Sequence, residues 1–190
     1  VGDNGTILTS SDATTWTSRT SGISKWIDAP IYKNSTFMTI GQDGVILTST
    51  DGTTWTSRTS GTSNDFYDVT YGNSTFVAVG DSGQIFTSSD GTSWDNRTSG
   101  TTNDLTGVDY GNSTFVAVGM NGTILSSADG ITWTSRTSGT TVGFTGFDYG
   151  NSIFVAVGYS GLILTSTDGI TWTSRTSSTS IRLTGVDYKE

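Results

Sequence analysis

The sequence contains no cysteine and no histidine in its 190 residues, and its only glutamate is Glu190. Without cysteine the chain has no disulfide, no thiolate nucleophile and no thiolate metal site. Without histidine it lacks the commonest general base and the commonest transition-metal ligand. These absences exclude the hydrolytic arrangements that are built on histidine or cysteine.

Basic residues are also scarce: the chain has nine Lys and Arg against 17 Asp and Glu, so its formal net charge is −8. Binding to a phosphate backbone or to an anionic membrane surface needs a basic face, so we expect no nucleic-acid partner and no membrane association of that kind. No apolar run approaches the length of a membrane span, so we expect no membrane insertion. No signal peptide is visible, although the chain opens at Val1 in the middle of a repeat.

The sequence is dominated by an internal repeat of 39 residues, marked by tryptophans at equal spacing. Each tryptophan ends nearly the same phrase, for example Ser-Thr-Asp-Gly-Thr-Thr-Trp at residues 49–55. A fixed period of this length predicts an array of one supersecondary unit. We therefore treat residues 1–190 as a single repeat domain, either complete or part of a longer chain. The five tryptophans are Trp16, Trp55, Trp94, Trp133 and Trp172.

Each repeat predicts four short strands and no helix, as residues 105–139 illustrate. Segments of four to eight residues are bounded there by Gly, Asn, Asp or Ser, which are strand and turn signals. The second segment, 115–118, is continuously apolar and therefore predicts a strand that is buried on both faces. The fourth segment alternates around Trp133, which predicts one packed and one solvated face. Such a sheet fits the blade of an all-β propeller.

The number of repeats predicts a five-bladed β-propeller whose closing blade is shared between the termini. The first, third and fourth strands occur five times, but only four second strands are complete. The closing blade would take its first strand from around Leu183 and its last two strands from the N-terminus. We expect its missing strand to come from sequence before Val1 or from a neighbouring chain by self-association, or else the blade to be distorted. The alternative architecture is an open array or a segment of a larger propeller.

The repeated phrase resembles the Asp-box (BNR) repeats of β-propellers, on residues Ser49, Asp51, Gly52, Thr54 and Trp55 of the second copy. The resemblance covers almost the whole chain. It implies that the box is a structural turn joining the third and fourth strands of a blade. Asp and Gly are adjacent here, one residue tighter than the commonest family spacing, and the first copy has alanine at position 13 in place of the glycine.

The aspartates of the five boxes are expected to be structural. An aspartate before glycine can accept hydrogen bonds from nearby backbone N–H groups while the glycine adopts a positive φ. The alternative is a calcium site, which one aspartate per turn does not favour, because calcium takes six to eight oxygen ligands. These aspartates are Asp12, Asp51, Asp90, Asp129 and Asp168.

Differences between the copies concentrate on one predicted face of the array. The turn between the first two strands and the Asp box are nearly constant, whereas the second-to-third and fourth-to-first connections vary and share the opposite face. Loops that face a ligand are free to change, so we predict that this face binds one; the alternative is drift without function. The candidate ligand-binding residues are Trp26, Asn64, Asp65, Asn103, Asp104 and Tyr159.

Asp109, Asp148 and Asp187 occupy equivalent positions in the first strands, which should line the central channel. A partial ring of carboxylates could hold a cation, but solvated strand ends are the favoured interpretation. We therefore expect neither a metal nor another cofactor.

Asp-box repeats also occur in sialidases and other glycosidases, so the resemblance raises the possibility of glycoside hydrolysis. Glycoside hydrolysis usually needs two carboxyl groups facing one sugar, whereas the aspartates here recur once per blade. We expect a non-enzymatic, extracellular or cell-surface interaction module that binds a glycan or a protein through the variable face. The alternative is a structural subunit or spacer of a surface appendage or assembly, or an engineered repeat scaffold, without a ligand.

Overall fold

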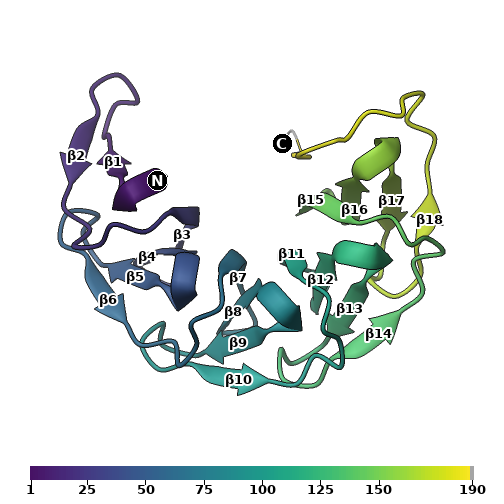
Figure 1. The fold of residues 1–190 in the computed structure, drawn as a ribbon, viewed down its shortest axis with the longest axis horizontal. Coiled ribbons are helices and arrows are strands. Elements are labelled where there is room, and N and C mark those ends of the chain that lie inside the picture. Colours follow the sequence, from purple (N-terminus) through teal and green to yellow (C-terminus); the bar gives the residue numbers. More distant parts are fainter. Residues whose placement is uncertain (189–190) are drawn as a thin grey trace.

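The computed structural model describes residues 1–188, in which short antiparallel strands form a series of sheets arranged along an open arc (Figure 1). Four of the sheets have four strands each, paired in chain order. They comprise β3 (Ile27–Lys33), β4 (Thr36–Gly41), β5 (Ile46–Ser49) and β6 (Thr56–Arg58); β7 (Phe66–Gly72), β8 (Thr75–Gly80), β9 (Ile85–Ser88) and β10 (Asp95–Arg97); β11 (Leu105–Gly111), β12 (Thr114–Gly119), β13 (Ile124–Ser127) and β14 (Thr134–Arg136); and β15 (Phe144–Gly150), β16 (Ile153–Gly158), β17 (Ile163–Ser166) and β18 (Thr173–Ser174). The predicted four-stranded unit is thus confirmed in four repeats.

The first strand of each complete sheet lies on the inside of the arc and the fourth on the outside (Figure 1). A single turn of 3₁₀ helix joins the second strand to the third in each complete sheet, and an equivalent turn precedes β1. These turns are η1 (Asp3–Gly5), η2 (Gln42–Gly44), η3 (Asp81–Gly83), η4 (Met120–Gly122) and η5 (Tyr159–Gly161).

The hairpin between the first two strands is made by an Asn-Ser pair. Asn73 and Ser74 have φ values of 45° and 59°, and Asn112 and Ser113 have 45° and 60°. Two consecutive residues at positive φ match the right-handed twist of the flanking strands, and asparagine tolerates that region better than most residues. Local chemistry therefore explains why this turn is constant between the copies.

The predicted closing blade is not formed, which corrects the expectation of a closed five-bladed ring. The N-terminal sheet contains only β1 (Ile7–Thr9) and β2 (Thr17–Arg19), and residues 183–188 form no strand in the described structure. Figure 1 shows a gap between this sheet and the C-terminal segment. Side chains packed between neighbouring sheets set the angle between them, and five sheets at this angle do not complete a turn.

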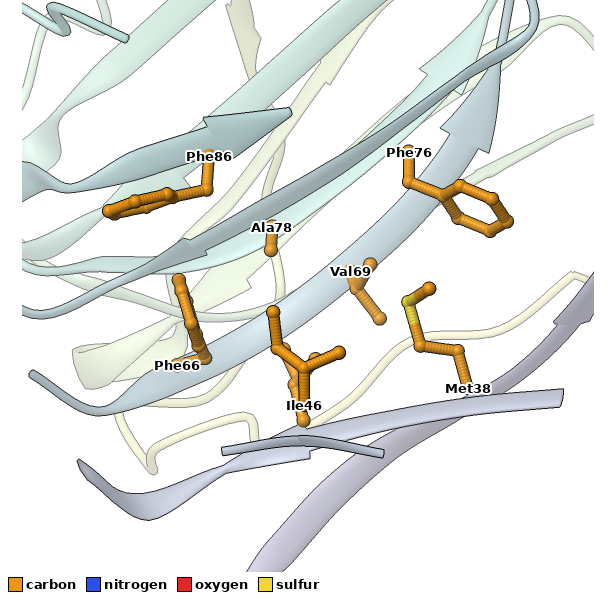
Figure 2. Packing of buried hydrophobic residues seen from close by; sticks show 8 residues of the cluster. Met38, Ile46, Phe66, Val69, Phe76, Ala78 and Phe86 are labelled. Atoms are coloured by element: carbon orange, nitrogen blue, oxygen red, sulfur yellow. The ribbon is translucent and has the colours of Figure 1, made fainter. Parts of the chain in front are cut away.

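The apolar core lies between neighbouring sheets. In Figure 2, Met38 and Ile46 of one sheet face Phe66, Phe76 and Phe86 of the next. All of these side chains are buried, and the two following sheet pairs repeat the arrangement. The apolar second strands β8 and β12 are buried on both faces, as predicted, because they lie between two such layers.

Candidate polar groove on the variable face

Two of the predicted ligand residues tie neighbouring sheets together. The Asp65 carboxylate accepts a hydrogen bond from the backbone N–H of Asp43 at 2.8 Å, and the Asp104 carboxylate accepts one from Ser82 at 2.9 Å. Asp43 and Ser82 have positive φ values of 54° and 55°. Each carboxylate thus stabilises a strained turn in the preceding repeat and is engaged in that structural contact.

Asn64 and Asn103, two of the other candidates, line one groove on this face, with a volume of about 790 Å³. The groove runs between the loops that precede β7 and β11, and it is also lined by Gln84, just before β9, and by Asn96 and Arg97 of β10. Its one aromatic lining residue is Phe86, which is only 4% exposed. Asn96 pairs with Phe86 across the sheet, whereas the Arg97 side chain lies on the opposite face, so the groove offers amides with little apolar surface.

Hydrogen bonds fix three of these side chains in place. Gln84 accepts a hydrogen bond from Thr62 Oγ1 at 3.1 Å and donates one to the backbone oxygen of Asp65 at 2.8 Å. Arg97 donates through Nε to Thr87 Oγ1 at 2.8 Å and through Nη2 to Asp95 at 3.0 Å.

Asn103 donates from Nδ2 to Thr123 Oγ1 and accepts at Oδ1 from Asn121 Nδ2, both at 2.9 Å. Side chains that are already ordered lose less conformational entropy when a ligand binds.

Trp26 and Tyr159, the aromatic candidates, are not among the groove residues. The Trp26 ring is parallel to that of Tyr67, with ring centroids 6.3 Å apart, and the Tyr67 hydroxyl donates to Asp81. Tyr159 is 40% exposed, and the guanidinium of Arg182 lies 4.8 Å from its ring centroid. The structure thus separates the aromatic candidates from the amide candidates.

The sequence did not single out Gln84 and Asn96, which line this groove, or Asp95, which accepts a hydrogen bond from Arg97. A comparison of single repeat positions could have found them, because the third tryptophan repeat departs from the other copies at all three. The residues equivalent to Gln84 are Thr6, Val45, Thr123 and Leu162, those equivalent to Asp95 are Thr17, Thr56, Thr134 and Thr173, and those equivalent to Asn96 are Ser18, Ser57, Ser135 and Ser174.

The box aspartates bind their own turns. The Asp51 Oδ1 atom accepts hydrogen bonds from Ser49 Oγ at 2.9 Å and from the backbone N–H groups of Thr53 and Thr54 at 2.7 and 2.8 Å. The same pattern recurs at Asp12, where the N–H groups of Thr15 and Thr14 and the hydroxyl of Ser10 lower the carboxyl pKa to about 2. These carboxylates are saturated by local donors, which explains their recurrence in every repeat.

The inner strands are linked by carboxylates as well. Asp109 accepts hydrogen bonds from the backbone N–H of Tyr110 at 2.7 Å and from that of Tyr149, in the next sheet, at 2.9 Å. Asp68, which sequence analysis did not single out, makes the corresponding link to Val108 at 2.9 Å. Burial raises the pKa of Asp109 above its usual range and that of Asp68 to about 7.

The cation hypothesis for the channel receives no support from this geometry. Within residues 1–188, no group of three or more acidic, histidine or cysteine side chains is gathered to hold a metal ion. Asp187 accepts a hydrogen bond from the neighbouring N–H of Tyr188 at 2.7 Å, and Asp148 and Asp109 follow the same pattern. These carboxylates accept hydrogen bonds from backbone N–H groups.

No protein-family model matches the chain, so the Asp-box resemblance is not confirmed by that comparison. No curated protein matches its sequence. Solved structures do match. "YCF48 bound to D1 peptide" aligns with a TM-score of 0.66 and 20% identity over 84% of this chain and 56% of that one. YCF48 from Cyanidioschyzon merolae aligns with a TM-score of 0.65 and 20% identity over 85% and 59%.

The computationally designed Ika8 protein aligns with a TM-score of 0.78 and 15% identity, over 98% of this chain and 60% of that one. The chain has a β-propeller-like repeat fold. It spans less than two thirds of the length of these solved chains. Among the described residues, no helix is both long and apolar enough to cross a membrane.

Proposed function

We propose that this chain is a non-catalytic interaction module that binds an extended polar peptide in the groove between the loops preceding β7 and β11. The observation that carries the proposal is the set of amide residues that line it: Asn64, Gln84, Asn96 and Asn103. Amide side chains can donate to and accept from a peptide backbone at the same time.

A peptide fits this groove better than a glycan does. Sugar recognition commonly uses an exposed aromatic ring, and the only aromatic ring of the groove, Phe86, is buried. The solved YCF48 complex with a D1 peptide supports the proposal at the level of the fold, since it shows a protein of this fold with a peptide bound. Glycan binding through the separate ring of Tyr159 is the competing hypothesis.

The absence of catalysis is part of the proposal. The chain has no histidine or cysteine, and the carboxylates of the Asp boxes accept hydrogen bonds from their own turns. We also propose a location outside the cell or at its surface, on the basis of the Ser/Thr/Gly-rich, weakly charged composition.

The test is to select peptides from a random linear display library with the purified 190-residue chain and to measure affinities by calorimetry. Asn96→Ala should weaken a selected peptide about fivefold or more, because it removes an amide that can both donate and accept hydrogen bonds. Ser57→Ala is the matched control, since Ser57 occupies the equivalent position in another sheet. Equal effects of the two substitutions, or glycan-array binding without any peptide, would contradict the proposal.

A scaffold role is the second candidate, favoured by the uncovered sheet faces at both ends of the arc. These faces are independent of the groove.

A further inference from the structure

The first sheet exposes an apolar face that every later sheet covers. Leu8 of β1 is 46% exposed and Trp16 is 58% exposed. The residues equivalent to Leu8 in the later sheets, Leu47, Phe86, Leu125 and Leu164, are all buried. The later tryptophans are half-buried, and Trp94 packs against Met38 and Ile46 of the preceding sheet. Among the described residues, no preceding sheet lies against β1 and β2 (Figure 1).

The last sheet exposes the opposite kind of face. Val155 of β16 and Ile163 of β17 are only partly buried, whereas the equivalent Val116 and Ile124 are fully buried beneath the next sheet. Ile153, at the edge of this face, is 37% exposed.

These two ends are the separate halves of the interface that the arc already uses internally. Within the arc, a Val-Val-Ile surface such as Val116, Val118 and Ile124 receives a leucine and a tryptophan of the following sheet. We infer that two copies of this chain associate end to end, with the β1–β2 face of one copy packed on the β16–β17 face of the other. The inference is independent of the proposed peptide groove, which lies in the middle of the arc.

The C-terminal segment is already placed for such a joint. Leu183 donates its N–H to the backbone oxygen of Gly158 at 3.0 Å, and Thr145 donates its hydroxyl to the Leu183 oxygen. The second contact repeats that of Thr106 with Phe144. Residues 183–188 therefore lie where the first strand of a following sheet would lie, and this is a strand that the β1–β2 sheet lacks.

Almost the whole chain, 98%, follows the designed Ika8 fold and accounts for 60% of that longer chain. Two copies together therefore exceed that fold, so the joined copies are offset along the axis of the arc rather than arranged in one flat ring. A second copy would still lack the second strand of the joint, the one that carries Phe76, Phe115 or Phe154 in complete sheets. The joint is therefore smaller than the internal interfaces, and we expect an association that depends on concentration in the micromolar range rather than a permanent dimer.

Ala13 lies at the centre of this joint. The equivalent Gly169 packs so closely that a methyl group there would lie 2.5 Å from Val116, and at Gly130 it would lie 3.3 Å from Val77. In the joint, the methyl group of Ala13 would meet Val155, which is equivalent to Val116 and Val77. Ala13→Gly should therefore tighten the association.

The inferred contact is heterologous, because it joins two different faces, and this allows a sharp test. Leu8→Asp disables the first end and Ile163→Asp the last. In sedimentation velocity, the unmodified chain should increase in mean mass between about 1 and 200 µM, and each variant alone should stay monomeric. An equimolar mixture of the two variants should form a dimer and nothing larger, since one intact joint remains.

Ile131→Asp is the matched control, because Ile131 is 51% exposed but lies in the middle of the arc, and it should associate like the unmodified chain. Circular dichroism shows whether each variant folds. Trp16→Ser replaces Leu8→Asp, and Ile153→Asp replaces Ile163→Asp, if either does not. A monomeric unmodified chain at every concentration would overturn the inference, with the ends then left to a different partner. Dimerisation of Leu8→Asp alone, which requires pairing of like ends, would also overturn it.

Discussion

Replacement of a single tryptophan tests whether the sheets stabilise one another through these residues. Trp133 is half-buried against the cluster that contains Val77, Val79 and Ile85 of the preceding sheet, and its Nε1 donates to the Gly130 oxygen at 2.9 Å. Trp16 occupies the same position in the repeat but is 58% exposed, with no preceding sheet among the described residues. The same substitution, Trp→Ala, therefore removes an inter-sheet contact in one case and almost none in the other.

The magnitude follows from the buried area. A tryptophan side chain can bury ~200 Å², and burial of most of that area contributes about 3 kcal/mol at ~25 cal/mol per Å². The lost hydrogen bond adds about 1 kcal/mol, so Trp133→Ala should lower the free energy of unfolding by about 3–4 kcal/mol. Trp16→Ala should lower it by less than about 1 kcal/mol, as is usual at exposed positions.

Urea denaturation followed by far-ultraviolet circular dichroism measures both values, at protein concentrations low enough to exclude association. An array of repeats can unfold in parts, so hydrogen exchange of the strands on either side of Trp133 provides a second measurement. If the two substitutions lower the free energy of unfolding equally, the tryptophans act within their own turns, and the explanation by contacts between sheets is wrong.

Two other predictions concern backbone geometry and pH. Ala13 has a φ of 58°, so Ala13→Gly should raise the free energy of unfolding by about 1 kcal/mol. Gly169→Ala should lower it by more than about 2 kcal/mol, because the added methyl group would also clash with Val116. Thermal melts measure both effects, and small effects of equal size would refute the steric reasoning. Burial raises the pKa of Asp68 to about 7, well above the ~3.9 of an unfolded chain, so the folded state binds this proton more tightly and stability should rise as the pH falls from about 8 towards about 4. Below about pH 4 the trend should reverse. The carboxylates of the Asp boxes accept hydrogen bonds from backbone N–H groups of their own turns, which lowers the pKa of Asp168 to about 2. Protonation of these carboxylates removes the stability that the hydrogen bonds contribute. Asp68→Asn should reduce the change of the urea midpoint between pH 5 and 8. A change as large as that of the unmodified chain would show that other groups cause the pH dependence.

The repeat unit could be predicted from sequence because its determinants are local. Asn73-Ser74 and its equivalents specify a hairpin through positive φ. Asp51 and its equivalents specify a turn by accepting hydrogen bonds from the N–H groups two and three residues later. The apolar second strand indicated burial on both faces. Each of these signals involves residues close together in the chain, so one repeat is enough to reveal it.

The site could be predicted only in part. Variation between copies pointed to the right face, and Asn64 and Asn103 do line its groove. Asp65 and Asp104 lie on that face but stabilise turns of the preceding repeat, a contact between residues 22 positions apart that no local pattern reveals. Gln84 and Asn96 line the groove because the turn before β9 and the strand β10 lie beside it.

The sequence by itself determined the 39-residue period, the four strands of each blade and the chemistry of every turn, because these depend on backbone preferences and on which face of a strand is apolar. Only the tertiary structure decided whether the ring closes, which amides share a groove and which tryptophan is left exposed. Those properties depend on the angle between neighbouring sheets. Packing of side chains from different repeats sets that angle, and a small change in it accumulates along the arc.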